Sequence, residues 1–484
     1  MRFRTSVLFY INEKRYEIAD ERVYLTLSDF LRYEIGMTGT KVVCAEGDCG
    51  ACTVLMASVH EMNQNKWVFK SVNSCIFPVF ALDGAQLITV EGLKKDNQLH
   101  PVQKAMFENF GSQCGFCTPG FVCAMTAMVE DSISEKKEIT EKRAKNYLTG
   151  NLCRCTGYQP ILRAAVSLEV NEIESLQMRF HNLSIIKELQ KNVKIPLVLD
   201  LGIRKLFLPV TLKQALQFKN KYKNCRLIAG ATDLGVAVNK GRSSYLEMMS
   251  LQNISSLWKV DRKKNYLEIP CRVPLTSLQR NLDGDFPELE KMLNIFASPQ
   301  IKNTGTLVGN VVNASPISDT IPFLLVNDAL VVVESIHKKR LIPINEFFIG
   351  YKKLDLKPAE IVTAIRLPRS RALNYLKLYK VSLRKDLDIS AVTMAISFRL
   401  KNRMIEEARI AFGGVGPTVF RLKELEQSWC GRAPSRDLFL KSSLEVIKIV
   451  NPISDVRGSR EYRLKVCQNL MLRLADEMEA EGHL

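Results

Sequence analysis

Apolar and polar residues alternate at the start of the chain, in "MRFRTSVLFYINEKRYEI". This period of two is typical of strands. Farther on, "LTLSDFLRYEIG" has helical spacing and predicts a helix with Ser28 as its N-cap and Gly36 after its end. Residues 1–90 therefore predict a small α+β unit of short strands, turns and one helix.

The pattern becomes helical between about residues 95 and 168. A Thr or Pro at the first positions favours a helix start, and a Gly favours a stop. Three helices are expected: one from Thr118 and Pro119, one from Thr140 that stops at Gly150, and one from Gln159–Pro160. A compact helical unit should therefore follow the first unit.

The remaining chain predicts further α/β units. Residues 169–198 resemble a partly helical connection that leads to the α/β pattern around "FLPVTLKQALQFKN". Near residue 370, "LPRSRAL" separates a region rich in Gly, Asn, Ser and Pro from a final unit with strands such as "AVTMAISFRL". The predicted division is 1–90, 91–168, a linker at 169–198, 199–370 and 371–484.

Length and composition fit this division. At 484 residues the chain is too long for one ordinary core, and 46% apolar with 25% charged residues is typical of a folded protein. No apolar run is long enough to span a bilayer, and the N-terminus lacks a signal-peptide pattern, so we expect a cytoplasmic protein without membrane association.

The net charge of +17 raises the question of nucleic-acid binding. Basic residues are interleaved with acidic ones, as in "EKKEITEKRAKNY", and no nucleic-acid motif accompanies them. Solvated helix faces, or a docking surface for an acidic partner, explain this pattern better.

Thirteen cysteines in a chain without a signal peptide favour metal binding or catalysis over disulfides. The five scattered cysteines are expected to be buried small hydrophobic residues: Cys123, Cys225, Cys271, Cys430 and Cys467. The five histidines are not paired at ligand spacing, which disfavours a histidine-based zinc or iron centre. The other eight cysteines form two groups.

The first cysteine group comprises Cys44, Cys49, Cys52 and Cys75, in "CAEGDCGACTV" and "NSC". The spacing C-x4-C-x2-C with a distant fourth cysteine is that of a plant-type 2Fe–2S site. Glycines in the loop suit the tight turns that aim backbone N–H groups at sulfur. A four-cysteine zinc site is the alternative, but it more often uses two separated C-x2-C pairs.

The second group joins Cys114 and Cys117 of "CGFC" to Cys153 and Cys155 of "CRC". A thioredoxin-like dithiol would not need the second pair. Zinc is the alternative on spacing alone. A second 2Fe–2S cluster is favoured because two one-electron centres in one chain make an electron path.

Two later segments could hold a diphosphate, although the chain has no Rossmann G-x-G-x-x-G fingerprint there. Gly230 and Gly309–Asn310 permit close approach of backbone N–H groups to phosphate. Hydroxyl donors are offered by Thr232, Thr306 and Ser318. Read alone, an ordinary strand-to-helix turn and a capped loop explain these segments more often than a cofactor site does.

Taken together, "CAEGDCGACTV", "SQCGFCTPG" and "GNLCRCTGYQPI" resemble the iron–sulfur domains of the molybdenum hydroxylases, the xanthine dehydrogenase and aldehyde oxidase family. Downstream, "RLIAGATDLGV", "FASPQIKNTGTLVGNVVNASPISDTIP", "YKVSLRKDLDISAV" and "FGGVGPT" resemble that family's FAD domain and the domain after it. The resemblance implies an α+β multidomain fold. Its parts would be a β-grasp plant-type 2Fe–2S ferredoxin domain, a helical 2Fe–2S domain, an α+β FAD-binding domain of the molybdenum hydroxylase (PCMH-like) type and a C-terminal α+β flavoprotein domain.

The resemblance also implies site residues. The eight grouped cysteines would bind two 2Fe–2S clusters, and Gln113 would face a molybdopterin cofactor in a partner chain. The residues implied for FAD are Leu227, Ile228, Ala229, Gly230, Ala231, Thr232, Asp233, Leu234, Phe296, Thr306, Gly309, Asn310, Ser318, Asp319, Val362 and Lys380. Val308 and Ala231 depart from the family's usual glycine or polar residues, a difference that bears on FAD affinity.

The function implied is electron transfer in a xanthine dehydrogenase that converts hypoxanthine and xanthine to urate. Electrons from a molybdopterin-binding large subunit, in a heterodimer or heterotetramer, would reach NAD+ through two 2Fe–2S clusters and FAD. No catalytic side chain is expected in this chain. An aldehyde or N-heterocycle hydroxylase is the alternative with the same architecture, and a zinc-stabilised nucleic-acid-binding module is the alternative from another class.

Overall fold

The structure, a computed structural model, describes residues 3–369, 375–482 and 484. The chain forms two compact units. Unit 1 comprises Met1–Trp258 and Ser298–Gly305, and unit 2 comprises Lys259–Ala297 and Thr306–Leu484. The boundary expected at residues 370 and 371 lies outside the described residues.

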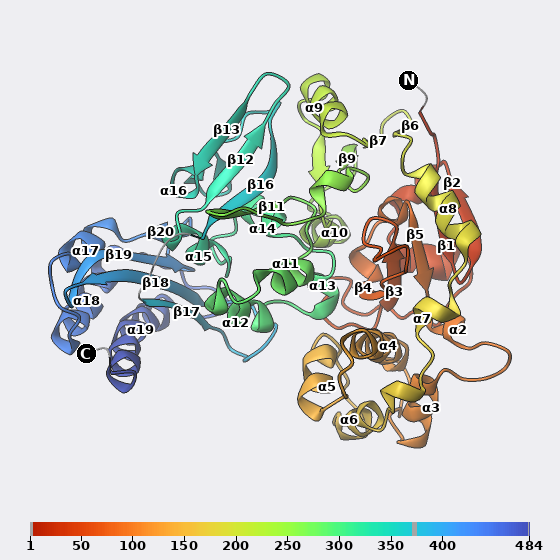
Figure 1. Cartoon of the computed structure of the whole chain (residues 1–484), viewed down its shortest axis with the longest axis horizontal. Coiled ribbons are helices and arrows are strands. Elements are labelled where there is room, and N and C mark those ends of the chain that lie inside the picture. The colour runs from red at the N-terminus through yellow and green to blue at the C-terminus, as the bar shows by residue number, and fades with distance from the viewer. Residues whose placement is uncertain (1–2, 370–374, 483) are drawn as a thin grey trace. The chain divides into compact units, whose positions relative to one another are not determined.

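Unit 1 begins with a five-stranded mixed sheet in the order β2-β1-β5-β3-β4 (Figure 1). The alternating N-terminal segment forms an antiparallel hairpin, whose turn residues Asn12 and Glu13 both have positive φ, as a tight two-residue hairpin turn requires. Only β1 and β5 pair in parallel within this sheet. The strands are β1 (Val7–Ile11), β2 (Lys14–Ile18), β3 (Thr53–Ser58), β4 (Lys70–Asn73) and β5 (Ala85–Ile88).

The helix predicted in "LTLSDFLRYEIG" is present, but its predicted N-cap is wrong. Helix α1 (Leu27–Asp29) continues as a π-helical turn at Phe30–Glu34. Thr26 is the N-cap, because its hydroxyl accepts a hydrogen bond from the Asp29 N–H, whereas Ser28 is buried inside the first turn. Gly36 follows the end with a φ of 72°.

The next part of unit 1 is helical, and all three predicted helix starts are confirmed. Helix α4 begins at Thr118 with Pro119 in its first turn, Thr140 caps α5, and α6 begins at Gln159. The helices are α2 (Val90–Leu93), α3 (Pro101–Glu108), α4 (Thr118–Glu135), α5 (Glu141–Leu148) and α6 (Gln159–Val166).

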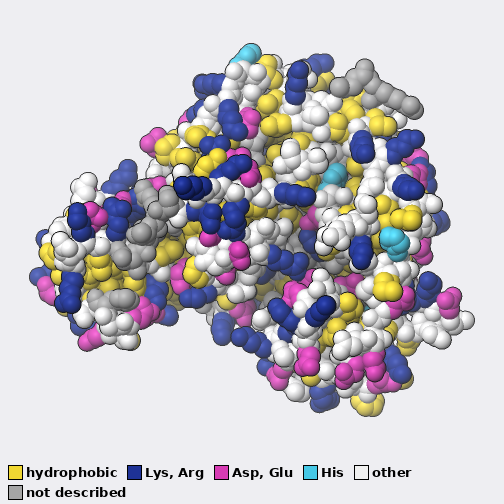
Figure 2. Space-filling view, in the orientation of Figure 1, with side chains coloured by type: hydrophobic (Ala, Val, Ile, Leu, Met, Phe, Trp, Pro, Cys, Tyr) yellow, Lys and Arg dark blue, Asp and Glu magenta, His cyan; other side chains and the backbone are white. Residues whose placement is uncertain are grey.

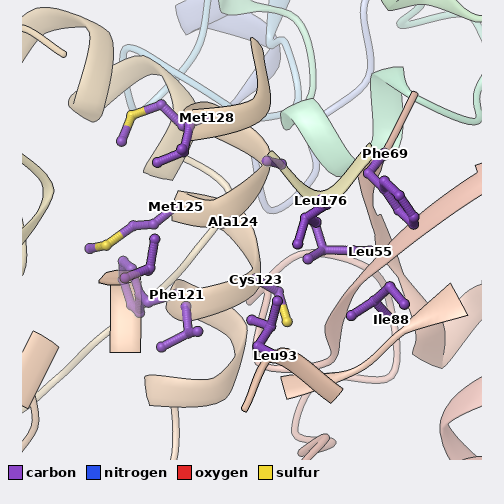
Figure 3. Close-up of a cluster of buried hydrophobic side chains, with 14 of the residues drawn as sticks. Leu55, Phe69, Ile88, Leu93, Phe121, Cys123, Ala124, Met125, Met128 and Leu176 are labelled. Carbon is purple, nitrogen blue, oxygen red and sulfur yellow. The ribbon is translucent and has the colours of Figure 1, made fainter. Parts of the chain in front are cut away.

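Helix α4 packs against the first sheet and forms much of the core of unit 1. Phe121, Cys123 and Met125 of this helix belong to the same buried cluster as Leu55 of β3 and Ile88 of β5 (Figure 3). Each of these side chains is almost fully buried, which stabilises the fold by roughly 1.5–3 kcal/mol for a large apolar side chain. The helical part is therefore fixed to the sheet by a shared core.

A second, four-stranded sheet completes unit 1, in the order β6-β7-β9-β8, with β9 parallel to both of its neighbours. The connection that leads to it is partly helical, as expected. Its elements are α7 (Leu176–Arg179), α8 (Leu183–Asn192), β6 (Leu197–Asp200), β7 (Lys205–Leu208), α9 (Leu212–Lys221), β8 (Arg226–Ile228), α10 (Thr232–Asn239) and β9 (Glu247–Ser250). Helix α13 (Pro299–Lys302) also belongs to unit 1 and contacts β4.

Unit 2 contains two larger antiparallel sheets. The first has the order β10-β11-β16-β12-β13, with β10 (Asp261–Arg262), β11 (Tyr266–Pro270), β12 (Leu330–Glu334), β13 (Lys339–Pro343) and β16 (Ile361–Pro368). The second has the order β17-β18-β19-β20, with β17 (Tyr375–Val381), β18 (Val392–Lys401), β19 (Met404–Gly413) and β20 (Phe420–Arg421).

Helices cover the sheets of unit 2. In the C-terminal part, α17, α18 and α19 bury an apolar cluster with β18 and β19 that includes Trp429 and Phe439. The helices of unit 2 are α11 (Leu275–Leu282), α12 (Pro287–Ile295), α14 (Leu307–Asn313), α15 (Ile321–Val326), α16 (Ile344–Phe347), α17 (Lys423–Trp429), α18 (Arg436–Ile449) and α19 (Arg460–Ala480), and a short hairpin is formed by β14 (Phe348–Gly350) and β15 (Lys353–Leu354).

The surface charge is mixed. On the face drawn in Figure 2, Lys and Arg side chains are spread among Asp and Glu, as the interleaved sequence predicts. In the part of the chain that the structure describes, none of the helices is both long and apolar enough to cross a membrane.

Candidate functional site

The first cysteine group lies on two loops at one end of the first sheet. Cys44, Cys49 and Cys52 precede β3, and Cys75 lies in the 3-10 turn Ser74–Ile76 that follows β4. The backbone N–H groups of Glu46 and Cys49 both donate to Cys44 Sγ at 3.4 Å. Such N–H donors stabilise a thiolate and tune a cluster that it binds.

Glycines allow this loop to wrap, as predicted. Gly47 and Gly50 have φ values of 75° and 67°, a region that strains other residues. The side-chain amide of Asn73 donates to the Gly47 carbonyl at 2.6 Å. The loop is thereby tied to the end of β4, next to Cys75.

The four thiols of this group shift one another's pKa values. The interaction with Cys49, and then that with Cys75, holds the pKa of Cys44 far below its usual range, and the interaction with Cys75 lowers the pKa of Cys52. The same interactions, together with burial, raise the pKa values of Cys49 and Cys75. The four cysteine side chains are therefore neighbours, although they come from two loops.

The second cysteine group lies where two helices end. Cys114 and Cys117 precede α4, and Cys153 and Cys155 follow α5. Cys155 Sγ is 3.6 Å from Cys114 Sγ and 3.8 Å from Cys153 Sγ. Cys153 also contributes to the pKa shift of Cys117, so these two side chains are neighbours as well.

The thiols of the second group differ in acidity. Burial, with the interaction with Cys153, raises the pKa of Cys117 to about 12. Burial alone would raise the pKa of Cys153. Hydrogen bonds from Thr156, whose hydroxyl lies 3.0 Å from the sulfur, outweigh burial and lower this pKa to about 7. A lowered pKa favours the thiolate, which is the form of cysteine that binds metals.

A single metal ion and a two-iron cluster need different arrangements. One ion needs its ligands around one point, whereas a two-iron cluster binds two pairs of thiolates. Among the residues described, no three His, Cys, Asp or Glu side chains are arranged to hold one metal ion.

The two cysteine groups are tied directly to each other. The Leu152 N–H donates to the Cys49 carbonyl at 3.0 Å, and the Asn151 side chain donates to the Gly50 carbonyl at 2.9 Å. A Cβ added at Gly120 would lie 2.2 Å from the Gly50 oxygen, so the first turn of α4 packs on the same loop. Leu152 is adjacent to Cys153, and one hydrogen bond therefore separates the backbones of two predicted ligands.

The segment 227–234 expected at FAD forms a strand, a turn and a helix in unit 1. Leu227 and Ile228 end β8, and α10 begins at Thr232. A Cβ at Gly230 would lie 2.0 Å from the Thr304 carbonyl oxygen, so only glycine allows this close approach. Ala231, at the N-cap with a φ of 60°, has no side-chain acceptor, which leaves the N–H groups of the first turn available to a phosphate.

Five of the residues expected at FAD form a hydrogen-bonded loop in unit 2. Thr306 caps α14 by accepting from the Gly309 N–H at 3.0 Å. Asn310 Oδ1 accepts from Ser318 Oγ at 2.5 Å. Asp319 forms an ion pair of 2.6 Å with Lys380, and both side chains are almost fully buried. The structure thus brings Lys380 of β17 to the loop that precedes α15.

Other residues expected at FAD lie elsewhere in unit 2. Val362 is buried in β16, which α14 contacts, and Phe296 is half-buried at the end of α12. Val308 is a buried residue of α14, and its side chain fills core space that a glycine would leave empty. Gly414, in "FGGVGPT", donates its N–H to the Pro316 carbonyl at 2.7 Å, which ties this segment to the same loop.

The scattered cysteines are mostly core residues. Cys123, Cys225, Cys271 and Cys467 are buried, as expected. The expectation is wrong for Cys430, which is exposed. It follows the last residue of α17, where the helix ends at the surface.

Comparison with known families identifies three segments. The chain matches the FAD binding domain in molybdopterin dehydrogenase over residues 202–370, the 2Fe–2S binding domain over 89–166 and the CO dehydrogenase flavoprotein C-terminal domain over 377–478. The chain belongs to the molybdenum hydroxylase family. The predicted family and fold class are confirmed, and the chain contains 2Fe–2S binding and FAD binding domains of this family.

Xanthine dehydrogenases are among the curated members of this family that are similar to the chain. Xanthine dehydrogenase 1 of Arabidopsis thaliana is 31% identical over 92% of this chain and 37% of its own length. Xanthine dehydrogenase/oxidase of Mus musculus is 31% identical over 88% of this chain and 36% of its own length. The chain therefore spans little more than a third of these relatives.

Solved structures of the family share the fold. Carbon monoxide dehydrogenase from Hydrogenophaga pseudoflava is 22% identical with a TM-score of 0.52, over 55% of this chain and 94% of that chain. Quinoline 2-oxidoreductase from Pseudomonas putida 86 is 21% identical with a TM-score of 0.53, over 57% of this chain and 97% of that chain.

Sequence reasoning missed several residues that hold the site. Asn151 and Gln300 are linked by a hydrogen bond of 2.8 Å between the Gln300 amide and Asn151 Oδ1 beside the Gly50 loop. Asn239 donates to two carbonyls of the first cysteine group. The stretch around Gln300 carries the family resemblance, but a side-chain amide has no local pattern that reveals such a role.

Proposed function

We propose that this chain is the electron-transfer part of a xanthine dehydrogenase, with two 2Fe–2S clusters and FAD. The observation that carries the proposal is the hydrogen bond from Leu152 to Cys49, which joins the two cysteine groups. One-electron centres placed this close suit a relay, and the xanthine dehydrogenases among the relatives support the choice of enzyme.

When bound, the clusters would accept and release single electrons, and FAD would convert single electrons into pairs for NAD+. The chain's own contribution is placement. Thiolates of the two groups would ligate iron, and the N–H groups of Glu46 and Cys49 would hold negative charge at Cys44. No side chain needs to act as a general base.

For FAD, we propose that residues 227–234 of unit 1 bind the cofactor. In unit 2, the residues assigned to FAD on the family resemblance are Thr306, Gly309, Asn310, Ser318 and Asp319. Both groups lie within the matched FAD binding domain. The support is chemical: backbone N–H groups at the start of α10 and the close approach at Gly230 in unit 1, and the Thr306 hydroxyl in unit 2, each suit a diphosphate. Lys380, Phe296 and Val362 are assigned on the family resemblance.

We also propose a molybdopterin-binding partner that docks over the second cysteine group. Cys114 and Cys155 are exposed there, next to Gln113. Large apolar side chains close to these cysteines in the sequence are exposed: Phe107, Phe110, Phe116, Leu152 and Tyr158, with Phe110 79% exposed. We call these five residues the apolar rim. Aromatic side chains of this kind gather at protein–protein interfaces.

The first test measures iron, zinc and FAD in one sample of anaerobically purified protein, together with its visible spectrum. About four irons and one FAD per chain, with bands that dithionite bleaches, would support the proposal. Colourless protein with stoichiometric zinc, and binding to DNA or RNA that weakens steeply with salt, would contradict it.

A second test separates the clusters. Cys153→Ser should remove one of two cluster signals in electron paramagnetic resonance and leave FAD bound. Cys467→Ser is the matched control, because Cys467 is a buried cysteine outside both groups. Oxidation of purines, aldehydes and N-heterocycles by the complex with its molybdopterin subunit, with NAD+ or oxygen as acceptor, would then decide the reaction. A cytoplasmic location stays a prediction.

A further inference from the structure

Helix α10 ends on the loops that hold the first cysteine group. The side-chain amide of Asn239, its last residue, donates to the Ala45 carbonyl at 2.8 Å and to the Cys75 carbonyl at 2.7 Å. Both partners are acceptors, so the amide nitrogen, and not the amide oxygen, must face them. One side chain thus joins the loop after Cys44 to Cys75, the first and last predicted ligands.

The rest of α10 follows the same loops. A Cβ at Gly235 would lie 2.2 Å from the Ile76 carbonyl oxygen, and Val236 packs against Cys52 and Cys75. One residue beyond the helix, Lys240 forms an ion pair of 2.7 Å with Glu46. The contact is therefore continuous from the middle of the helix to its end.

The same helix begins in the segment proposed for FAD. Ala231 is its N-cap and Thr232 its first residue, directly after the turn at Gly230. A helix is a rigid connection, and this one is eight residues long, or about 12 Å. A displacement at one end is therefore transmitted to the other.

We infer that Asn239 is a positioning residue, which fixes the geometry and the reduction potential of the cluster at Cys44, Cys49, Cys52 and Cys75. Through Asn239, α10 ties that cluster to the FAD-binding segment. The inference rests on the proposed function, because it requires a 2Fe–2S cluster at these four cysteines.

The expected direction of the effect follows from electrostatics. The Asn239 N–H groups offset two carbonyl dipoles beside the site. Removal of these donors makes the surroundings more negative, which disfavours the reduced and more negative cluster. Asn239→Asp also adds a negative charge, so its effect should exceed that of Asn239→Ala.

The experiment is a redox titration of the full chain, loaded with both clusters and FAD, followed by electron paramagnetic resonance. The cluster of the second cysteine group is the internal reference. In Asn239→Asp, the ratio of reduced to oxidised first cluster at a fixed potential should fall about tenfold, a downward shift of 59 mV for one electron. FAD content and the second cluster's potential should not change.

Asn12→Ala is the matched control. Asn12 is a half-buried asparagine of the same unit, and its amide donates to Thr89 at 2.9 Å. A shift of the first cluster only in the Asn239 variants would support the inference. An unchanged potential and signal in Asn239→Asp and Asn239→Ala, or an equal shift in Asn12→Ala, would overturn it. Wild-type protein without two cluster signals would contradict the proposed function itself before any variant is compared.

Discussion

Ala231 shows how one residue can store strain at a site. It adopts a left-handed conformation with a φ of 60°, which costs a non-glycine residue roughly 1–2 kcal/mol. Glycine adopts this conformation without strain. In the unfolded chain, however, glycine has more conformational entropy than alanine, and this offsets part of the gain in stability. We expect Ala231→Gly to stabilise the chain by about 0.5–1 kcal/mol, measured as a higher midpoint of unfolding in urea.

Ala229→Gly is the control for this prediction. Ala229 lies two residues earlier, among residues without a positive φ. Its replacement should destabilise the chain by about 0.5–1 kcal/mol. Similar losses in both variants would show that Ala231 is not strained. FAD titration of Ala231→Gly would also show whether this departure from the family weakens cofactor binding.

His100 should make unit 1 sensitive to acid. It caps α3 by accepting from the Val102 N–H, it is 1% exposed, and burial, with the charge of Arg179, lowers its pKa from 6.5 to about 4. The unfolded chain binds the proton more tightly. The contribution of His100 to the free energy of unfolding is therefore complete above pH 6.5 and is lost as the pH drops toward 4.

His100→Asn keeps a capping acceptor and does not titrate. Between pH 7.5 and 4.5, the wild type should lose about 2–3 kcal/mol more unfolding free energy than this variant does. Chemical denaturation at the two pH values measures the difference. Parallel pH profiles for the two proteins would contradict the prediction.

Single residues were predictable from the sequence where their partners are close in the chain. Cys44, Cys49 and Cys52 lie within one loop, so their spacing alone predicts a cluster. Asn239 could not be found in this way, because the carbonyls that it binds belong to residues 194 and 164 positions away. A helix-terminal asparagine is otherwise an ordinary surface residue.

At the scale of elements, the main prediction concerns Gly120, where α4 packs on the Gly50 loop. It lies in the first turn of α4, and a Cβ there would meet the Gly50 oxygen at 2.2 Å and the Ala51 Cα at 3.1 Å. Both contacts are backbone atoms, so neither can yield by a rotamer change. Gly120→Ala should push the helix from the loop, cost about 2–3 kcal/mol and lower the iron content.

Gly157→Ala separates crowding from backbone strain. Gly157 has a φ of 65°, but a Cβ there would meet nothing within 4 Å. This variant should lose about 1 kcal/mol and keep both cluster signals. If Gly157→Ala lost iron as readily as Gly120→Ala, the close contact between α4 and the Gly50 loop would not be the cause.

Element starts were predictable because a cap is a local feature. Thr140 and Pro119 signal helices within a few residues, and the structure has both helices. The error at α1 has the same physical basis: Thr26 and Ser28 can both accept from a backbone N–H, and their hydroxyls lie 3.0 Å apart. Which of them caps is decided by packing, since Ser28 is buried.

At the scale of the whole molecule, the apolar rim predicts how the chain finds its partner. Phe110→Ser should weaken binding of a molybdopterin-containing partner about tenfold or more, because the hot spots of an interface, which are rich in aromatic residues, each cost about 2 kcal/mol or more when truncated. Calorimetric titration of one chain with the other measures this effect. Both clusters and FAD should be retained.

Ile203→Ser is the control for Phe110→Ser. Ile203 is 83% exposed, but it lies in the turn between β6 and β7 of the second sheet. Its replacement should leave partner binding unchanged. Equal weakening by both variants would mean that the apolar rim is not the docking surface.

The division into two units could not be predicted from the sequence. Ser298–Gly305 lies within the predicted region 199–370, yet it belongs to unit 1, where Asn303 donates to the Ser71 carbonyl at 2.9 Å. The packing of this late segment in unit 1 depends on contacts between distant parts of the chain, and composition and periodicity do not reveal such contacts. The four-domain division stays a prediction.

The late position of α13 in the chain has a consequence for biosynthesis. The first cysteine group is complete at Cys75, whereas Ile301, which packs against Cys52 and Cys75, is added more than two hundred residues later. At a translation rate of 5–20 residues per second, the ribosome needs roughly 10–45 s to make the chain between them. For that time the four thiols have been made without Ile301 beside them, and the proposed cluster would have an interval for delivery to the nascent chain before α13 packs there.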